Sequence, residues 1–125
     1  KHFDEVVDNT GTSANIKVLG FTDKVPELMS VSDLVITKPG GLTTTESLAS
    51  GLPIIVINPI PGQEEENAKF LEDQKVAVWL KKDDDIKEVL TNLFTSAYDL
   101  KNMKIRARLL AKKNSTADIC KILLV

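Results

Sequence analysis

Residues 34–46 read LVITKPGGLTTTE, and this stretch decides the fold because a strand signal passes into a helix signal through a glycine turn. Residues 34–37 form a short, mostly β-branched apolar run that favours a strand. The Pro-Gly-Gly at 39–41 ends this strand, and a helix is predicted from there to about residue 49, closed by Gly51. A strand followed directly by a helix is the repeating unit of parallel α/β sheets.

The same alternation continues outward on both sides of this unit. Residues 54–57 read IIVI, a continuous apolar run expected where helices cover both faces of a sheet. Further strands are predicted at 16–19 and 76–80, and further helices at 26–31, 64–73, 86–93, 100–112 and 117–124. The predicted fold class is α/β: a Rossmann-like parallel sheet of about four strands, with helices on both faces and right-handed crossovers.

Composition narrows the range of functions. The chain has 125 residues, 42% hydrophobic and 27% charged, which fits one soluble domain. A formal net charge of −2 argues against nucleic acid as a partner, because phosphate backbones require clustered basic residues. The single cysteine, Cys120, excludes an internal disulfide and is expected to pack in the core. Neither a membrane span nor a signal peptide is recognisable, which predicts a cytoplasmic location.

The glycine turn carries the clearest chemical signal. Ligands of open parallel sheets collect at the carboxyl ends of the strands, where the next helices begin. Gly40 and Gly41 let the backbone approach a ligand, and the free amides of the helix start attract anions. Thr43, Thr44 and Thr45 add hydroxyl donors. The turn therefore predicts a diphosphate site that needs no metal.

Two interpretations of Glu46 stay open at this point. Thr43 and Glu46 have the spacing of a capping box, in which the glutamate bonds back to the amide of the capping residue. Spacing alone favours this structural role. The alternative is a carboxylate that binds both ribose hydroxyls of a nucleotide, as acidic residues do in dinucleotide folds.

Several segments in the same order resemble the C-terminal lobe of one glycosyltransferase family. That family contains the MurG-type peptidoglycan N-acetylglucosaminyl transferases, the plant monogalactosyldiacylglycerol synthases and the bacterial diacylglycerol glucosyltransferases. The resemblance covers about residues 16–80 and rests on IKVLGFT at 16–22, PELM at 26–29, SDLVITKPGGLTTTE at 32–46, ASGLP at 49–53 and NPIPGQEEENA at 58–68. The Pro-Gly-Gln-Glu at 61–64 is closer to the glycolipid synthases than to the MurG type.

The resemblance implies a two-lobed GT-B fold, of which residues 1–125 are part of the donor-binding lobe. It implies a metal-independent, inverting transfer of a hexose from UDP-glucose or UDP-galactose to a diacylglycerol-type lipid. The full-length enzyme would then lie peripherally on the inner face of the cell membrane. The alternatives are an N-acetylglucosaminyl transferase of the MurG type, or a freestanding donor subunit or regulatory nucleotide-binding module that needs a separate acceptor partner.

Site residues follow from the resemblance by position. The implied roles are uracil binding for Phe21 and Thr22, diphosphate binding for Gly40, Gly41, Leu42 and Thr43, ribose binding for Glu46, and sugar binding for Gln63, Glu64, Glu66 and Asn67. The family's acceptor lobe and general base have no counterpart in this sequence. Catalytic residues therefore stay unidentified, and the chain alone is not expected to catalyse transfer.

Four other signals are given structural interpretations. The acidic run at 83–85 precedes a helix, where carboxylates more often cap than bind metal. The basic run between residues 101 and 113 is interpreted as a solvated helix face, with contact to anionic lipid as the alternative. Trp79 is expected to pack. His2 has no recognisable partner for a ligand role.

Overall fold

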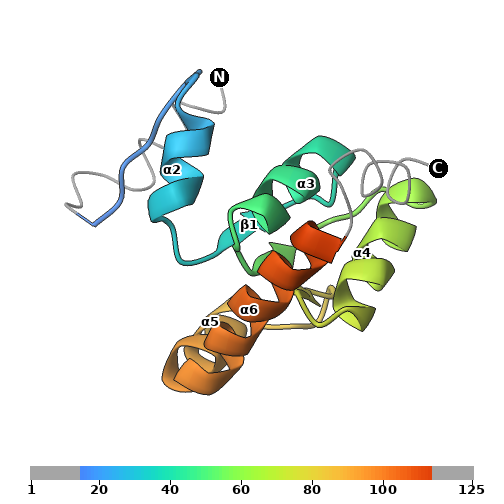
Figure 1. Cartoon of the computed structure of the whole chain (residues 1–125). Coiled ribbons are helices and arrows are strands. Elements are labelled where there is room, and N and C mark those ends of the chain that lie inside the picture. The colour runs from blue at the N-terminus through green and yellow to red at the C-terminus, as the bar shows by residue number, and fades with distance from the viewer. Residues whose placement is uncertain (1–14, 114–125) are drawn as a thin grey trace.

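The structure, a computed structural model, describes residues 15–113 and has the predicted α/β architecture (Figure 1). Its sheet consists of the parallel strands β1 (Val35–Thr37), β2 (Ile54–Val56) and β3 (Ala77–Trp79), in the order β1-β2-β3. Val35 pairs with Ile54, and Ile54 pairs with Ala77. The three strands therefore end at the same edge of the sheet, where the following segments are brought together.

The described helices are α2 (Val25–Val31), α3 (Gly41–Ala49), α4 (Gln63–Asp73), α5 (Ile86–Thr95) and α6 (Ala97–Lys113). The helix α3 connects β1 to β2, and α4 connects β2 to β3, so both helices begin at the carboxyl ends of strands. The prediction of helices at 64–73 and 86–93 is confirmed to within two residues. Residues 117–124, Cys120 and His2 lie outside the described residues.

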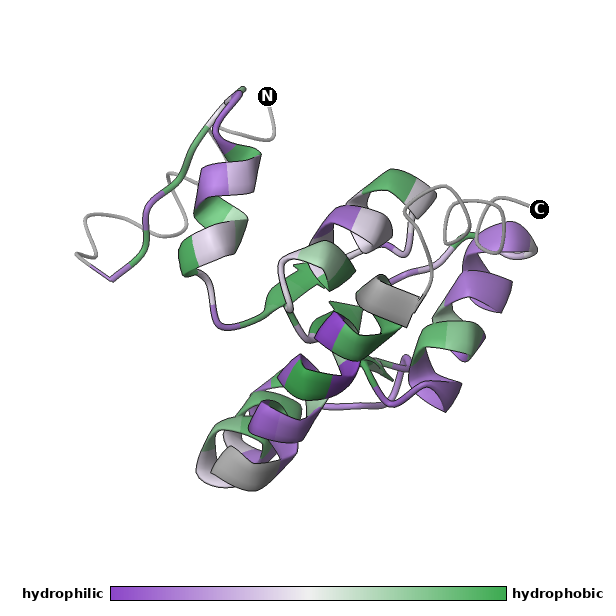
Figure 2. Cartoon of the chain, viewed as in Figure 1, coloured by the Kyte–Doolittle hydropathy of each residue, from purple (hydrophilic) through white to green (hydrophobic). Residues whose placement is uncertain are grey.

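The central strand β2 is buried on both sides. Ile54 and Val56 pack in one apolar cluster with residues of α3, α4 and α6, among them Leu48. Ile55 packs in a second cluster with Leu93 of α5 and Met103 of α6. Side chains of a strand point alternately to its two faces, so helices cover both faces as predicted. Figure 2 shows the strands in green, whereas the helices carry both purple and green residues and α4 is mostly purple.

The predicted strand at 16–19 is wrong. These residues are irregular, and Ile16 and Leu19 are 53% and 46% exposed. Figure 1 shows this segment and α2 standing apart from α3 and the sheet. A strand is stabilised by backbone bonds to a neighbour, and among the described residues β1 pairs only with β2. The described sheet therefore has three strands, where about four were predicted.

The prediction that Gly51 closes α3 is confirmed. Ser50 is the C-cap, and Gly51 follows it with a φ of 69°, in the left-handed region that glycine adopts without strain. The amide of Gly51 donates to the Leu48 carbonyl at 3.0 Å. Arg108 of α6 lies directly against this glycine, since a Cβ placed there would come within 2.5 Å of Arg108 Nε.

Candidate functional site

The start of α3 presents three unbonded backbone amides. Gly40 is the N-cap, and no side chain caps this end of the helix. The first bond of the helix runs from the Thr44 amide to the Gly40 carbonyl at 2.9 Å. Within the described part of the chain, the amides of Gly41, Leu42 and Thr43 therefore have no acceptor. Such amides, together with the positive end of the helix dipole, form an anion-binding site.

Gly40 has open space where a side chain would stand. Its φ of −69° and ψ of 146° are extended values that any residue adopts. A Cβ at this position would meet nothing within 4 Å. Neither backbone strain nor packing in the structure accounts for a glycine here. Glycine is a common N-cap residue, and it would also allow a ligand to approach the backbone closely.

The three threonines of α3 have different environments, so the prediction that all of them offer hydroxyls is wrong. Thr45 is buried, and its Oγ1 donates to the Gly41 carbonyl at 2.8 Å. Thr44 is fully buried, and its hydroxyl has no hydrogen-bond partner within residues 15–113. Thr43 alone is partly exposed. A helix buries one side, which here includes the second and third threonines.

The capping-box interpretation of Glu46 is also wrong. The helix begins at Gly41, so Thr43 is its third residue and cannot be the cap. Glu46 is half-buried and lies in the second turn. Across residues 15–113, its carboxylate makes no hydrogen bond or ion pair. The carboxylate is therefore available to a ligand bound near the helix start.

A side chain of α4 holds the glycine turn in place. Asn67 Nδ2 donates to the carbonyl of the buried Pro39 at 2.9 Å, and Asn67 Oδ1 accepts from Gln63 Nε2 at 3.1 Å. Asn67 is 3% exposed. Buried amides are stable only when bonded in this way. Asn67 therefore positions the turn, and a direct contact with sugar stays a prediction.

The other predicted sugar ligands lie in the first turn of α4, just before Asn67. Glu64 Oε2 accepts from the Ile60 amide at 2.6 Å and so braces the loop between β2 and α4. Gln63 is half-buried, and Glu66 is exposed. The structure thus brings the predicted sugar-binding segment beside the diphosphate turn, through the contact between Asn67 and Pro39.

The predicted uracil-binding residues are not brought to this turn. The Phe21 side chain is fully exposed, and Thr22 Oγ1 accepts from the Lys24 amide at 3.1 Å. Their segment precedes α2, which stands apart from the pair α3 and α4 in Figure 1. Their role stays a prediction.

Comparison with known proteins identifies the family. Residues 1–122 match the glycosyltransferase family 28 C-terminal domain. The chain belongs to this family. The predicted resemblance is therefore confirmed, and the α/β fold of the structure agrees with it.

Curated relatives of this family 28 chain include proteins named processive diacylglycerol β-glucosyltransferase. The chain is 43% identical over 104 residues to one from Bacillus pumilus and 41% identical over 104 residues to one from Bacillus subtilis. It is 36% identical over 110 residues to one from Staphylococcus haemolyticus. These alignments cover 83% to 88% of the chain but only 27% to 28% of the relatives' length.

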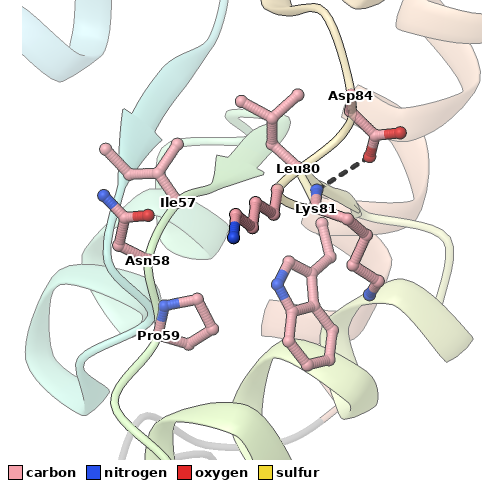
Figure 3. Close-up of a pocket in the computed structure, with 8 residues that line it drawn as sticks. Ile57, Asn58, Pro59, Leu80, Lys81 and Asp84 are labelled. Atoms are coloured by element: carbon pink, nitrogen blue, oxygen red, sulfur yellow. Dashed lines mark hydrogen bonds between the residues drawn. The ribbon is translucent and has the colours of Figure 1, made fainter.

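One pocket of this family 28 domain was missed by sequence reasoning. It measures about 490 Å³ and lies where β2 and β3 end (Figure 3). Trp79, expected only to pack, is one of its lining residues, which are Ile57, Asn58, Pro59, Trp79, Leu80, Lys81, Lys82 and Asp84. The sequence does contain a signal for this pocket, because residues that follow neighbouring parallel strands meet at one edge of the sheet.

The acidic run at 83–85 acts in helix capping, as predicted. Asp85 is the N-cap of α5, and its Oδ1 accepts from the Lys87 amide at 2.9 Å. Asp84 Oδ2 accepts from the Lys81 amide at 2.7 Å. Two of the three carboxylates therefore shape the chain between β3 and α5.

Among residues 15–113, no helix is both long and apolar enough to cross a bilayer.

Proposed function

We propose that this family 28 chain is the UDP-sugar-binding part of a glycosyltransferase that transfers a hexose, glucose or galactose, to a diacylglycerol-type lipid. The observation that carries the proposal is the open start of α3, with unbonded amides at Gly41, Leu42 and Thr43 and free space beside Gly40. The relatives named diacylglycerol β-glucosyltransferase support the acceptor class and favour glucose.

The distribution of charge selects α3 over α4 for the diphosphate. Both helices begin at the same edge of the sheet, but the first turn of α4 contains Glu64, Glu65 and Glu66. The first turn of α3 contains no acidic residue. Three carboxylates would repel a diphosphate from α4, whereas each bond from an α3 amide to a phosphate oxygen contributes about 1.5–3 kcal/mol.

The nucleoside and the sugar then extend in different directions from the diphosphate. Glu46 lies one turn further along α3, where its carboxylate accepts bonds from the ribose hydroxyls. Gln63 and Glu66 lie in the first turn of α4, which Asn67 joins to the glycine turn. The sugar therefore extends toward α4, and its hydroxyls meet the polar side chains of that helix.

The chemistry follows from the site. When the bond between the sugar and UDP breaks, negative charge grows on the leaving diphosphate. The amides and dipole of α3 stabilise this charge, which is the role of a metal ion in other transferases. Transfer is then metal-independent, and attack from the opposite side of the sugar inverts its configuration. The acceptor is bound, and its hydroxyl deprotonated, by the remaining part of a longer protein at the membrane surface.

Calorimetry with UDP, uridine and UDP-glucose tests this proposal on the 125-residue chain. UDP is expected to bind at least about tenfold more tightly than uridine, because the α3 amides add bonds to the diphosphate. Addition of EDTA is expected to leave the UDP affinity unchanged. Equal affinities for UDP and uridine would contradict a diphosphate site at α3, and a loss of UDP binding in EDTA would contradict metal independence.

A further inference from the structure

The basic run between residues 101 and 113 lies within α6, and its charge contrasts with that of the whole chain. Six of the 16 basic residues lie in α6, whereas only one of the 18 acidic residues does. The chain as a whole has a formal net charge of −2. Positive charge is therefore concentrated on one helix of an otherwise acidic molecule. Charge concentrated in this way attracts an anionic partner.

One side of α6 packs into the core of the domain. Met103 packs with residues of β2 and α5, and the fully buried Ala107 lies in one cluster with Leu48 of α3. Figure 1 shows α6 in front of the sheet, and no described element lies over it in that view. The opposite side of α6, which we call its outer side, faces away from the core.

Two large apolar side chains lie on the outer side of α6. Ile105 is 44% exposed and Leu109 is 59% exposed. Residues four apart are neighbours on one side of a helix, so these two form a row with Lys101, which is also exposed. Single exposed apolar residues are common, but a helix side that only meets water is otherwise polar. The pair therefore favours a partner with an apolar layer over the solvated helix face predicted from the sequence.

Only some of the basic residues of α6 are bonded within the domain. Lys104 Nζ forms an ion pair with Asp33 at 3.4 Å, and Arg106 Nε donates to a backbone carbonyl at 2.9 Å. Lys101 and Arg108 are exposed, and neither side chain makes a hydrogen bond or an ion pair with any residue from 15 to 113. The outer side of α6 thus combines available positive charge with apolar surface, a pattern typical of helices that lie on anionic bilayers.

We propose that the outer side of α6 contacts the surface of an anionic lipid bilayer. Ile105 and Leu109 enter the apolar layer beneath the headgroups, and Lys101 and Arg108 bind lipid phosphates beside them. The inference rests on the proposed function, because a diacylglycerol-type acceptor lies in a bilayer. Arg108 also lies against Gly51, the residue after the C-cap of α3. The contact therefore holds the helix that binds the donor close to the lipid surface.

Co-sedimentation of the 125-residue chain with lipid vesicles tests this inference. The probes are vesicles of phosphatidylcholine alone, and vesicles of phosphatidylcholine and phosphatidylglycerol mixed roughly two to one. Half of the chain should bind the mixed vesicles at an accessible lipid concentration on the order of 0.1–1 mM, and binding should be at least about tenfold weaker without the anionic lipid. Equal binding to the two kinds of vesicle, or binding to neither, would overturn the proposal.

A double variant tests the apolar contact, and the chain offers a matched control. Ile105→Ser combined with Leu109→Ser removes both exposed side chains and should weaken binding to the mixed vesicles at least about tenfold. Phe94→Ser removes an apolar side chain that is 52% exposed, but from α5, which has one basic and one acidic residue. This control should bind as the unsubstituted chain does. Equal losses in the two proteins would overturn the assignment to α6.

The contribution of charge is tested by Lys101→Glu, with Lys87→Glu as the same change at an exposed lysine of α5. Lys101→Glu should weaken binding to the mixed vesicles at least about fivefold, and Lys87→Glu should have a clearly smaller effect. Weakened binding with Lys101→Glu but unchanged binding with the double serine variant would indicate attraction to any polyanion, nucleic acid included, and would overturn a bilayer contact. In sedimentation velocity without lipid, a dimer that the double variant dissociates would assign this surface to a second copy and overturn the proposal.

Calorimetry without vesicles separates this inference from the proposed function. The double serine variant should bind UDP as tightly as the unsubstituted chain does, which also shows that the variant is folded. If UDP binds while the mixed vesicles do not, the inference fails and the proposed function stands. If the vesicles bind as predicted while UDP does not, the proposed function fails and the contact of α6 with the bilayer stands.

Discussion

The two ends of α3 each carry glycines, and the structure uses them in opposite ways. At the end of the helix, Gly51 has a φ of 69° and lies against Arg108. At the start, Gly40 has ordinary backbone angles and open space where a Cβ would stand. The left-handed backbone at residue 51 requires glycine. Neither backbone angles nor packing require glycine at residue 40. We propose that the glycine at the start of the helix instead leaves room for the diphosphate.

The largest effect is expected from Gly51→Ala. Alanine in the left-handed region costs about 1–2 kcal/mol, and its methyl group also displaces Arg108. The free energy of unfolding, measured by urea titration, should fall by at least that amount. UDP affinity of the folded variant should not change, because the α3 amides are untouched. An unchanged free energy of unfolding would contradict the claim that the fold requires glycine at residue 51.

A smaller effect, on binding alone, is expected from Glu46→Gln. Replacing the carboxylate weakens the bonds to the ribose hydroxyls, and UDP affinity should fall about tenfold, or about 1.4 kcal/mol. Stability should stay the same, since the carboxylate has no partner among residues 15–113. Calorimetry measures the UDP affinity, and urea unfolding of the same preparation measures the stability. Lost stability with unchanged affinity would return Glu46 to a structural role.

The smallest effect is expected from Thr43→Val. Thr43 is the one partly exposed threonine of α3, and its hydroxyl is proposed to bond the diphosphate. Loss of one such bond should weaken UDP about threefold to tenfold and leave uridine unaffected. The matched control is Thr45→Val: it removes the bond to the Gly41 carbonyl and should mainly lower stability. Equal losses for UDP and uridine with Thr43→Val would contradict a phosphate contact.

The sequence predicts features of this molecule that depend on local chemistry. We could predict the glycine turn, the closing role of Gly51 and the burial of β2. Each depends on the φ preference of one residue or on an apolar run of neighbouring residues. The strand at 16–19 was mispredicted because its apolar run does not reveal whether a partner strand is present. A short run of this kind is equally compatible with an exposed segment.

The details of the site depend on contacts between distant residues. The capping box was a reasonable prediction from spacing, but the helix begins three residues earlier than that motif requires. The turn before it is fixed by Asn67, which lies 28 residues after Pro39. The pocket at Trp79 likewise needs two strands to be placed side by side. Spacing within one segment cannot supply such information.

UDP binding by the Gly40→Ala variant tests the central claim most directly. The methyl group meets no atom of residues 15–113 within 4 Å, so stability should fall only by about 0.5–1 kcal/mol, because alanine is a poorer N-cap than glycine. It should obstruct the diphosphate, and calorimetry should show UDP affinity at least about tenfold lower, with uridine affinity unchanged. If Gly40→Ala binds UDP as tightly as the unsubstituted chain does, the start of α3 is not the diphosphate site.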